Sequence, residues 1–550
     1  MTCFIFLFII VVLFVLTESG ARNSKVASKY SLLSKRQAFG NNRLAASTRI
    51  EKSETALVTA KATEGPAQPF YMRVLPIFPK ELKKFFSLSF MMFWIVFVFT
   101  MTRDTKDALI VTNCGAESIA FLKVYGVIPA AVSFMVIYSA LARRLSHSHL
   151  FYAILLPFFV FYAAFAFILY PLRNILHPTH WALPNNGFSF AVNLLRYWIF
   201  SLYYIVSELW GSAGVPLLFW SCANDVVVID QAKRLYPLMS LIGNLGPILS
   251  GVTMAMVSAF VAKNVHNDEA AFELSLKILT GIMMGAGMIV MVLHNFVRNI
   301  HAEEVRDMRA SAVASFNTCT TPLTSIKPPI HVKHNKPSLS VWQSIKVLAS
   351  NTYLLNIATM VLSYGLSIEF TEIIWKAAVK AALPEKTEYL SFMGRYSTLV
   401  GSMAFIMMFV GARIVRMMGW RAGALTTPLM MGVLAAPFFF ILTFGDVKNN
   451  PKNLLWAVYI GLFQNVVSKA TKYAIFDPTK EISYIPLDSE SKTSGKAAID
   501  VLGARLGKSG GAFAQQMLVV ICGSIFSCAP YLSAMFYITI ILWTSKLTCY

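Results

Sequence analysis

Residues 85–102 read FFSLSFMMFWIVFVFTMT without a charged side chain, and RDTKD follows at 103–107. A helix needs about 20 predominantly apolar residues to cross a bilayer. The apolar run therefore predicts a membrane-spanning helix, with the charged pentapeptide closing it.

Eleven further apolar runs of spanning length follow this one, and a polar stretch separates the sixth run from the seventh. They lie near 119–141, 149–171, 190–222, 236–261, 274–297, 353–374, 394–415, 421–444, 453–475, 498–527 and 531–547. We therefore predict an all-α polytopic membrane protein with twelve transmembrane helices. Two six-helix halves, 76–297 and 346–550, joined by a polar basic linker at 298–345, would give a major-facilitator-like arrangement.

The composition supports this class. Hydrophobic residues make up 56% of the 550 and charged residues 14%, whereas soluble proteins carry about 25% charged residues. Seven scattered cysteines form neither a disulfide framework nor a metal-ligand pattern. The net charge of +21 indicates positive loops on one side of the membrane, or an anionic substrate drawn to a basic pathway, rather than a nucleic acid partner.

No pattern indicates an enzyme, a metal or a cofactor. Residues 503–509, GARLGKS, resemble a phosphate-binding P-loop. A P-loop has four residues between its glycines and follows a strand. Here three residues separate the glycines, and the segment lies in an apolar helical run, so an ATPase is rejected.

The N-terminus resembles a targeting address. Residues 4–16 are almost wholly apolar, and the small residues at 19–21 resemble a cleavage region, although no Lys or Arg precedes them; residues 1–21 are predicted to be signal-peptide-like. Residues 22–49 carry seven Lys or Arg and no acid, so 22–75 are predicted to be a disordered, transit-peptide-like segment. Plastids bounded by extra membranes, as in algae, use such a bipartite address. A signal anchor followed by a basic tail is the alternative.

Ionisable residues inside spans are costly and are candidates for function. Arg103 lies three residues before Lys106 and four before Asp107, so the three can share a helix face. Arg and Lys facing a cavity suit phosphate groups. The alternative is a helix end in the headgroup zone, with charges that neutralise one another.

Acidic residues also lie inside predicted spans. Glu208 is a candidate proton site, a partner of a buried Lys or Arg, or a structural ion pair between helices. Glu372 and Lys376 are four residues apart and can pair on one helix. Glu369 adds a second acid three residues before Glu372.

Lys508 stands between Gly507 and the glycines at 510–511, at the start of a span. Glycine-rich backbone at membrane depth is tolerated where it lines a cavity. A lysine beside exposed backbone amides would form a phosphate seat.

Several long motifs closely resemble the plastid and intracellular-bacterial nucleotide transporters, the ATP/ADP translocases unrelated to mitochondrial carriers. The motifs are TRDTKDALIVTNCGAESIAFLKVYG (102–126), SELWGS (207–212), LFWSCAND (218–225), DQAKRLYP (230–237), YGLSI (364–368), FDP (476–478), SYIPLD (483–488), KAAIDVLG (496–503) and LGKSGG (506–511). The resemblance covers roughly residues 75–545.

The resemblance implies antiport of ATP against ADP, often with phosphate, by a monomeric carrier in the lipid bilayer. The family's important charges fall on Lys106, Glu208, Glu372 and Lys508. The two lysines would hold phosphates, and the two acids would balance them in the empty carrier or couple to a proton. Arg103 is a secondary phosphate candidate. Lys376 and Asp107, like Glu369, are candidates for coupling or tuning.

One departure from the family keeps alternatives open. Glu369 stands where members usually have Asn. An added acid there favours a proton-coupled net importer of nucleotides with broader base specificity as the alternative to exchange. A membrane scaffold that does not transport is a third reading. The plastid inner envelope is the expected location, with the endoplasmic reticulum or another endomembrane as the alternative.

Overall fold

The computed structural model describes residues 77–178, 180–181, 189–318, 352–484, 499 and 504–548, and these residues form helices and connecting turns. Residues 1–21 and 22–75 lie outside the described part of the chain, as does 319–345 of the predicted linker. The helices described below belong to the unit Phe78–Tyr550.

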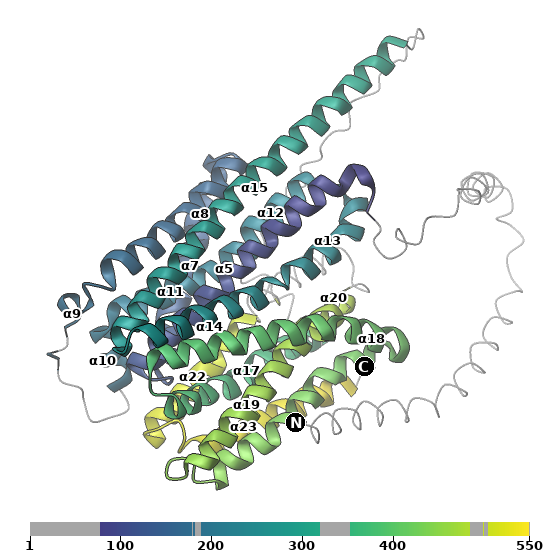
Figure 1. Cartoon of the computed structure of the whole chain (residues 1–550). Coiled ribbons are helices and arrows are strands. Elements are labelled where there is room, and N and C mark those ends of the chain that lie inside the picture. The colour runs from purple at the N-terminus through teal and green to yellow at the C-terminus, as the bar shows by residue number, and fades with distance from the viewer. Residues whose placement is uncertain are drawn as a thin grey trace, which may run out of the picture. The chain divides into compact units, whose positions relative to one another are not determined.

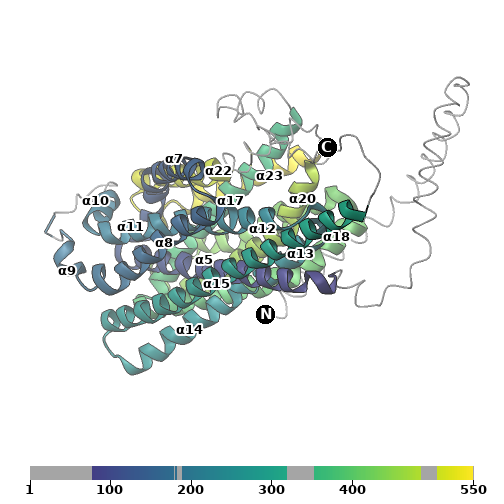
Figure 2. The same cartoon turned by 90° about the horizontal axis from the view of Figure 1, so that it is seen from above.

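The helices gather into two groups. The N-terminal bundle contains η1 (Pro79–Glu81), α5 (Leu82–Cys114), α6 (Ser118–Phe121), η2 (Leu122–Val127), α7 (Ile128–Arg144), α8 (His147–Ala164), η3 (Phe165–Leu169), α9 (Arg173–Leu176), α10 (Ser189–Arg196), α11 (Trp198–Ala213), η4 (Gly214–Phe219), α12 (Trp220–Val226), α13 (Ile229–Gly243), α14 (Gly246–Asn264) and α15 (Asp268–Thr318). The C-terminal bundle contains α17 (Thr352–Ala382), α18 (Lys386–Phe444), α19 (Pro451–Thr471), η5 (Lys472–Phe476), α20 (Asp477–Ser483), α22 (Ala504–Cys522) and α23 (Ala529–Thr548). Figure 1 shows the first group from purple to teal and the second from green to yellow, and Figure 2 shows them from above.

The predicted spans coincide with long helices. Among the described residues, nine helical stretches are long and apolar enough to cross a membrane, from Leu82–Cys114 to Arg413–Phe444. Helices α19, α22 and α23 occupy the three remaining predicted positions. The prediction of an all-helical polytopic membrane protein is confirmed, and the helices are consistent with twelve spans.

Two glycines mark the ends of spans. Helix α5 runs for 33 residues without Gly or Pro and ends at Gly115, where φ is +89°. Helix α18 contains two spans, and the chain turns between them at Gly419, where φ is +82°. Both values lie in the left-handed region that glycine adopts without a steric penalty. The loop predicted between 415 and 421 is therefore a turn at a single residue.

The two bundles meet along α14 and α18, which lie side by side. A Cβ atom on Gly251 of α14 would lie 2.4 Å from the carbonyl oxygen of Gly394 and 2.5 Å from the backbone nitrogen of Thr398 on α18. Small residues let membrane helices approach at backbone distance. Gly251 therefore determines how closely the bundles can approach at this point.

Hydrogen bonds and an ion pair also join the two bundles, at the N-terminal ends of α15 and α18. The Asp268 carboxylate accepts hydrogen bonds from the backbone N–H groups of Lys386 (2.8 Å) and Thr387 (3.0 Å). These amides lie in the first turn of α18 and lack partners within the helix, so Asp268 caps α18 from the other bundle. The Lys386 ammonium pairs with Glu269 and donates to Asn113 Oδ1 at 2.8 Å.

Replacing Gly251 with Ala should destabilise the protein. The added methyl group would contact backbone atoms that cannot move aside as a side chain could. Overpacking of this kind costs about 1–3 kcal/mol. We expect a lower midpoint of thermal unfolding for the purified protein in detergent. Gly285→Ala is the matched control, since nothing lies within 4 Å of its added Cβ. Equal midpoints for the two variants would contradict the role of Gly251.

Candidate functional site

Charged side chains from both bundles converge between the helices. They are Arg103, Asp104, Lys106 and Asp107 on α5, Lys123 on η2, Glu208 on α11, Glu369, Glu372 and Lys376 on α17, Lys469 on α19 and Lys508 on α22. We call this set the central charge cluster.

The cluster begins on α5, because this helix does not end where the apolar run ends. Helix α5 continues to Cys114, so 103–107 form part of its interior. Asp104, Lys106 and Asp107 are at most 4% exposed. Residues 103–107 are therefore not the end of the helix, and the charges of Asp104, Lys106 and Asp107 are buried among other helices.

Asp107 joins one lysine from each bundle. Its Oδ1 lies 2.7 Å from Lys106 Nζ, and its Oδ2 lies 2.8 Å from Lys376 Nζ. Lys376 Nζ is also 2.7 Å from Glu372 Oε1, which pairs with Lys469 Nζ at 2.9 Å. A buried charge is costly unless it is paired and hydrogen-bonded. The alternation of acid and base satisfies these charges across α5, α17 and α19.

Glu208 lies at the other end of this chain of charges. Its Oε1 is 3.0 Å from Lys106 Nζ, and its side chain is 32% exposed, whereas that of Lys106 is 4% exposed. The Lys106 ammonium also lies 4.0 Å from the centre of the Tyr204 ring, a favourable cation–π distance. Glu208 is therefore the partner of a buried lysine, as one of its sequence interpretations proposed, and it is reachable by water.

Two further contacts cross between the bundles. Arg103 Nη2 donates to Ser397 Oγ on α18 at 2.7 Å, while Arg103 Nε lies 2.9 Å from Asp104 Oδ1 of its own helix. Lys123 Nζ lies 2.6 Å from Glu369 Oε1. Glu369, the acid at the position where Asn was expected, is therefore paired with Lys123.

Lys123 and Lys469 were not among the predicted site residues. Lys123 belongs to the π-helical segment η2, inside a run that was counted as a span. Lys469 likewise lies within a predicted span and ends α19. The cost of a charge at membrane depth applies to both, and this signal could have identified them from the sequence.

Lys508 differs from the other lysines of the cluster. Its side chain is exposed, and no carboxylate of the described residues lies within 4.0 Å of it. It lies within electrostatic range of Glu208, Lys123 and Glu369. Lys508 is therefore an accessible cation whose charge is not cancelled by direct contact with any acid in the part of the chain that the structure describes.

The glycines around Lys508 have a different role from the one predicted. Helix α22 begins at Ala504, so these residues are helical, and the expectation of exposed amides beside Lys508 is wrong. A Cβ on Gly507 would lie 2.9 Å from the Leu362 carbonyl oxygen, and one on Gly511 would lie 3.0 Å from Glu369 Cβ. Glycines four residues apart thus let α22 approach α17 closely, as in other small-residue membrane contacts.

The cluster suits a ligand with several negative charges. Ammonium groups and a guanidinium group are strong donors to phosphate oxygens. In the structure, most of these donors already contact carboxylates, so a polyanion would have to replace those carboxylates. Among the described residues no group of three His, Cys, Asp or Glu side chains could hold a metal ion.

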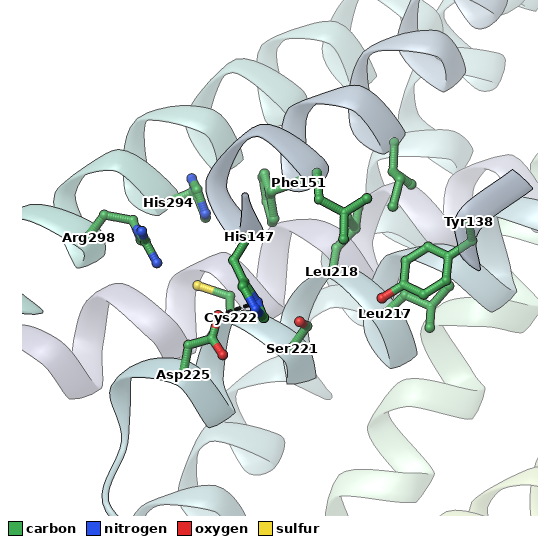
Figure 3. Close-up of a pocket in the computed structure, with 12 residues that line it drawn as sticks. Tyr138, His147, Phe151, Leu217, Leu218, Ser221, Cys222, Asp225, His294 and Arg298 are labelled. Atoms are coloured by element: carbon green, nitrogen blue, oxygen red, sulfur yellow. Dashed lines mark ion pairs between the residues drawn. The ribbon is translucent and has the colours of Figure 1, made fainter. Parts of the chain in front are cut away.

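A second pocket lies within the N-terminal bundle, between α7, α8, α12 and α15 (Figure 3). It has about 340 Å³ of empty space, part of which is open to solvent, and it includes His147, whose Nδ1 lies 2.9 Å from Asp225 Oδ2. The His294 ring stacks on Phe151 with ring centres 3.9 Å apart. Since the His147–Asp225 contact joins α8 to α12 and the stacked pair joins α8 to α15, the pocket links helices of one bundle.

Asp107→Asn should strongly destabilise the protein, because it leaves Lys106 and Lys376 with too little negative charge. Removing one partner of a buried ion pair costs about 3–5 kcal/mol. The double variant Asp107→Asn with Lys376→Gln removes one charge of each sign, and part of the stability should return.

The thermal midpoint and folded yield in detergent test this expectation. A single variant as stable as the parent, or a double variant less stable than the single one, would contradict the proposed dependence on charge matching.

The family model described as TLC ATP/ADP transporter matches residues 61–549. The chain is 38% identical over 488 residues to ADP,ATP carrier protein 1 of Chlamydia muridarum, covering 86% of this chain and 89% of that protein. It is also 38% identical over 475 residues to ADP,ATP carrier protein 1, chloroplastic, of Arabidopsis thaliana, covering 84% of this chain and 72% of that protein.

A less similar relative and a solved structure also match this chain over most of its length. The chain is 34% identical over 493 residues to ADP,ATP carrier protein 3 of Rickettsia felis, covering 86% of this chain and 94% of that protein. A crystal structure of the nucleoside transporter NupG superposes with a TM-score of 0.50 at 10% identity, covering 84% of this chain and 98% of that one. At this identity the second likeness concerns the fold alone.

Proposed function

We infer that this protein exchanges ATP for ADP across a membrane, because the chain belongs to the TLC ATP/ADP transporter family. The relatives at 38% identity are named as ADP,ATP carriers. The protein is a multi-pass membrane protein, and its activity is transport rather than an enzymatic conversion. No catalytic constellation is needed for this activity, since neither nucleotide changes covalently.

The central charge cluster carries the proposal for the binding site. Lys508, which is accessible and has no carboxylate of the described residues in contact, would meet the phosphates of an incoming nucleotide first. The phosphates would then compete with Glu208 for Lys106, which lies 3.0 Å from that acid. Lys106 comes from the N-terminal bundle and Lys508 from the C-terminal bundle, so one polyphosphate would contact both.

The pairing in the cluster also gives a reason for obligate exchange. Asp107–Lys376 and Lys123–Glu369 join the two bundles. We propose that these contacts hold the empty carrier in place, because separating buried charges without replacement is costly. A nucleotide would supply negative charge to the lysines and release the bundles for rocking about the central site.

The alternative of proton-coupled import rested on Glu369. Its carboxylate lies 2.6 Å from Lys123 Nζ and is 2% exposed. Glu369 is therefore paired with a cation of the other bundle in this structure. This pairing supports exchange over proton coupling, and the retained cluster supports transport over a scaffold role.

We propose a plastid envelope, most simply the inner one, as the location. Two similar proteins are described as a chloroplastic carrier and a plastidic ATP/ADP transporter. The basic, acid-free stretch at 22–49 resembles a transit peptide. The endoplasmic reticulum or another endomembrane is the second candidate, and microscopy of a fluorescent fusion would separate the two.

Uptake of labelled ATP into liposomes carrying the purified protein tests the function. We expect uptake that depends on ADP loaded inside, because the empty carrier should reorient slowly. Equal uptake into empty liposomes that grows with an inward proton gradient would instead favour proton-coupled import. Absence of uptake of every nucleotide tested would contradict transport.

Lys508→Gln should raise the ATP concentration needed for half-maximal uptake by roughly tenfold or more, since it removes a charge-assisted bond to phosphate. Lys508→Arg keeps the charge and should retain more activity. Lys546→Gln, at an exposed position in the last turn of α23, is the control. An unchanged ATP dependence in Lys508→Gln would remove Lys508 from the site.

A further inference from the structure

A crevice lies between α14 of the N-terminal bundle and α17, α18 and α19 of the C-terminal bundle. It has about 830 Å³ of empty space, which includes its opening to the surroundings. Its polar lining includes Ser258, Glu388, Ser391, Arg395 and Tyr459. None of these side chains belongs to the central charge cluster, so the crevice needs its own explanation.

The crevice opens away from the centre of the protein. Arg395 and Ser397 are two residues apart on α18, so their side chains point about 200° apart around the helix. Ser397 contacts Arg103 in the central charge cluster. Arg395 therefore faces the outer surface, where Leu455 and Tyr459 of α19 are 47% and 58% exposed. In a membrane protein this surface faces lipid.

Arg395 carries a positive charge on a surface where exposing a charge to lipid is costly. It lies nine residues after the start of α18, which is about 13 Å along the helix axis. Its side chain is exposed, and no carboxylate of the described residues lies within 4.0 Å of it. An arginine facing lipid must reach toward the headgroups or find an anion.

Glu388 lies on the same face of α18 as Arg395, nearer to the N-terminal end of the helix. The two are seven residues apart, which is almost two full turns, and Glu388 lies two residues after the first residue of α18. Glu388 is exposed at the rim of the crevice. The crevice is therefore negative near the water and positive nearer to the hydrocarbon.

Two hydroxyl groups in the lining also lack partners. Ser258 is 0% exposed and Ser391 is 8% exposed. Their Oγ atoms are buried without a hydrogen-bond partner. Buried polar groups are normally satisfied, so these two hydroxyls beside the crevice have hydrogen-bonding capacity that the described residues leave unused.

We propose that this crevice binds a zwitterionic phospholipid with a primary ammonium, of the phosphatidylethanolamine type. Arg395 holds its phosphate, and Glu388 pairs with its ammonium. In such a headgroup the phosphate lies nearer to the hydrocarbon and the ammonium nearer to the water, which matches the order of charges in the crevice. One acyl chain would lie along the apolar side chains of α14 and α19.

The bound lipid would touch both bundles, since Ser258 belongs to α14 and Arg395 to α18. It would therefore respond to the rocking of one bundle against the other. The proposal is independent of nucleotide exchange, because it uses no residue of the central charge cluster.

Native mass spectrometry of the full-length protein in detergent tests the proposal. The probes are phosphatidylethanolamine, the anionic phosphatidylglycerol and a phosphate-free galactosyl diacylglycerol. We expect the parent to retain phosphatidylethanolamine best. Arg395→Ala should reduce that retention roughly tenfold, by loss of a charge-assisted bond. Arg416→Ala, at another exposed arginine of α18, is the matched control and should leave retention unchanged.

Glu388→Gln provides a second variant at the exposed rim, where folding should be unaffected. It should shift the preference from phosphatidylethanolamine toward phosphatidylglycerol, because the ammonium loses its partner and a repelling charge disappears. Equal retention by parent, Arg395→Ala and Glu388→Gln would overturn the proposal. So would binding of the phosphate-free lipid as tight as that of phosphatidylethanolamine, or an equal loss in Arg416→Ala.

Discussion

The Asp107 carboxylate lies between two buried ammonium groups, with Lys106 at 2.7 Å and Lys376 at 2.8 Å. Buried ammonium groups at membrane depth are costly without such a partner. Because Lys106 is on α5 and Lys376 on α17, matching these charges also determines how closely the two bundles meet. Glu372 and Lys469 extend the same constraint to α19.

Charge pairing at this depth depends on helices that can approach closely. Gly511 leaves room for Glu369, whose Cβ would otherwise lie 3.0 Å from an added methyl group. Glu369 then contacts Lys123 of the other bundle. The glycines of α22 therefore contribute to the electrostatics of the site through packing, and not through the backbone amides.

The two sides of α18 serve different surroundings. Ser397 faces the central charge cluster, where polar groups are matched within the protein. Arg395 faces outward, and its charge is matched by no described carboxylate in contact. In a carrier that moves between two states, a nucleotide can enter the central charge cluster, and a lipid headgroup can pair with Arg395 on the outer face.

Sequence alone determined the all-helical membrane class, because spanning length and low charge content follow directly from composition. It also identified Lys106, Glu208, Glu372 and Lys508 as candidate site residues, because a charge inside an apolar run is costly whatever the arrangement of the helices. Only the tertiary structure decided their partners. Asp107 and Lys376 are 269 residues apart in the chain, and helical periodicity reveals which face a residue occupies but not which helix that face meets. For the same reason the interior position of 103–107, the helical backbone around Lys508 and the contact between Lys123 and Glu369 required the packed bundles.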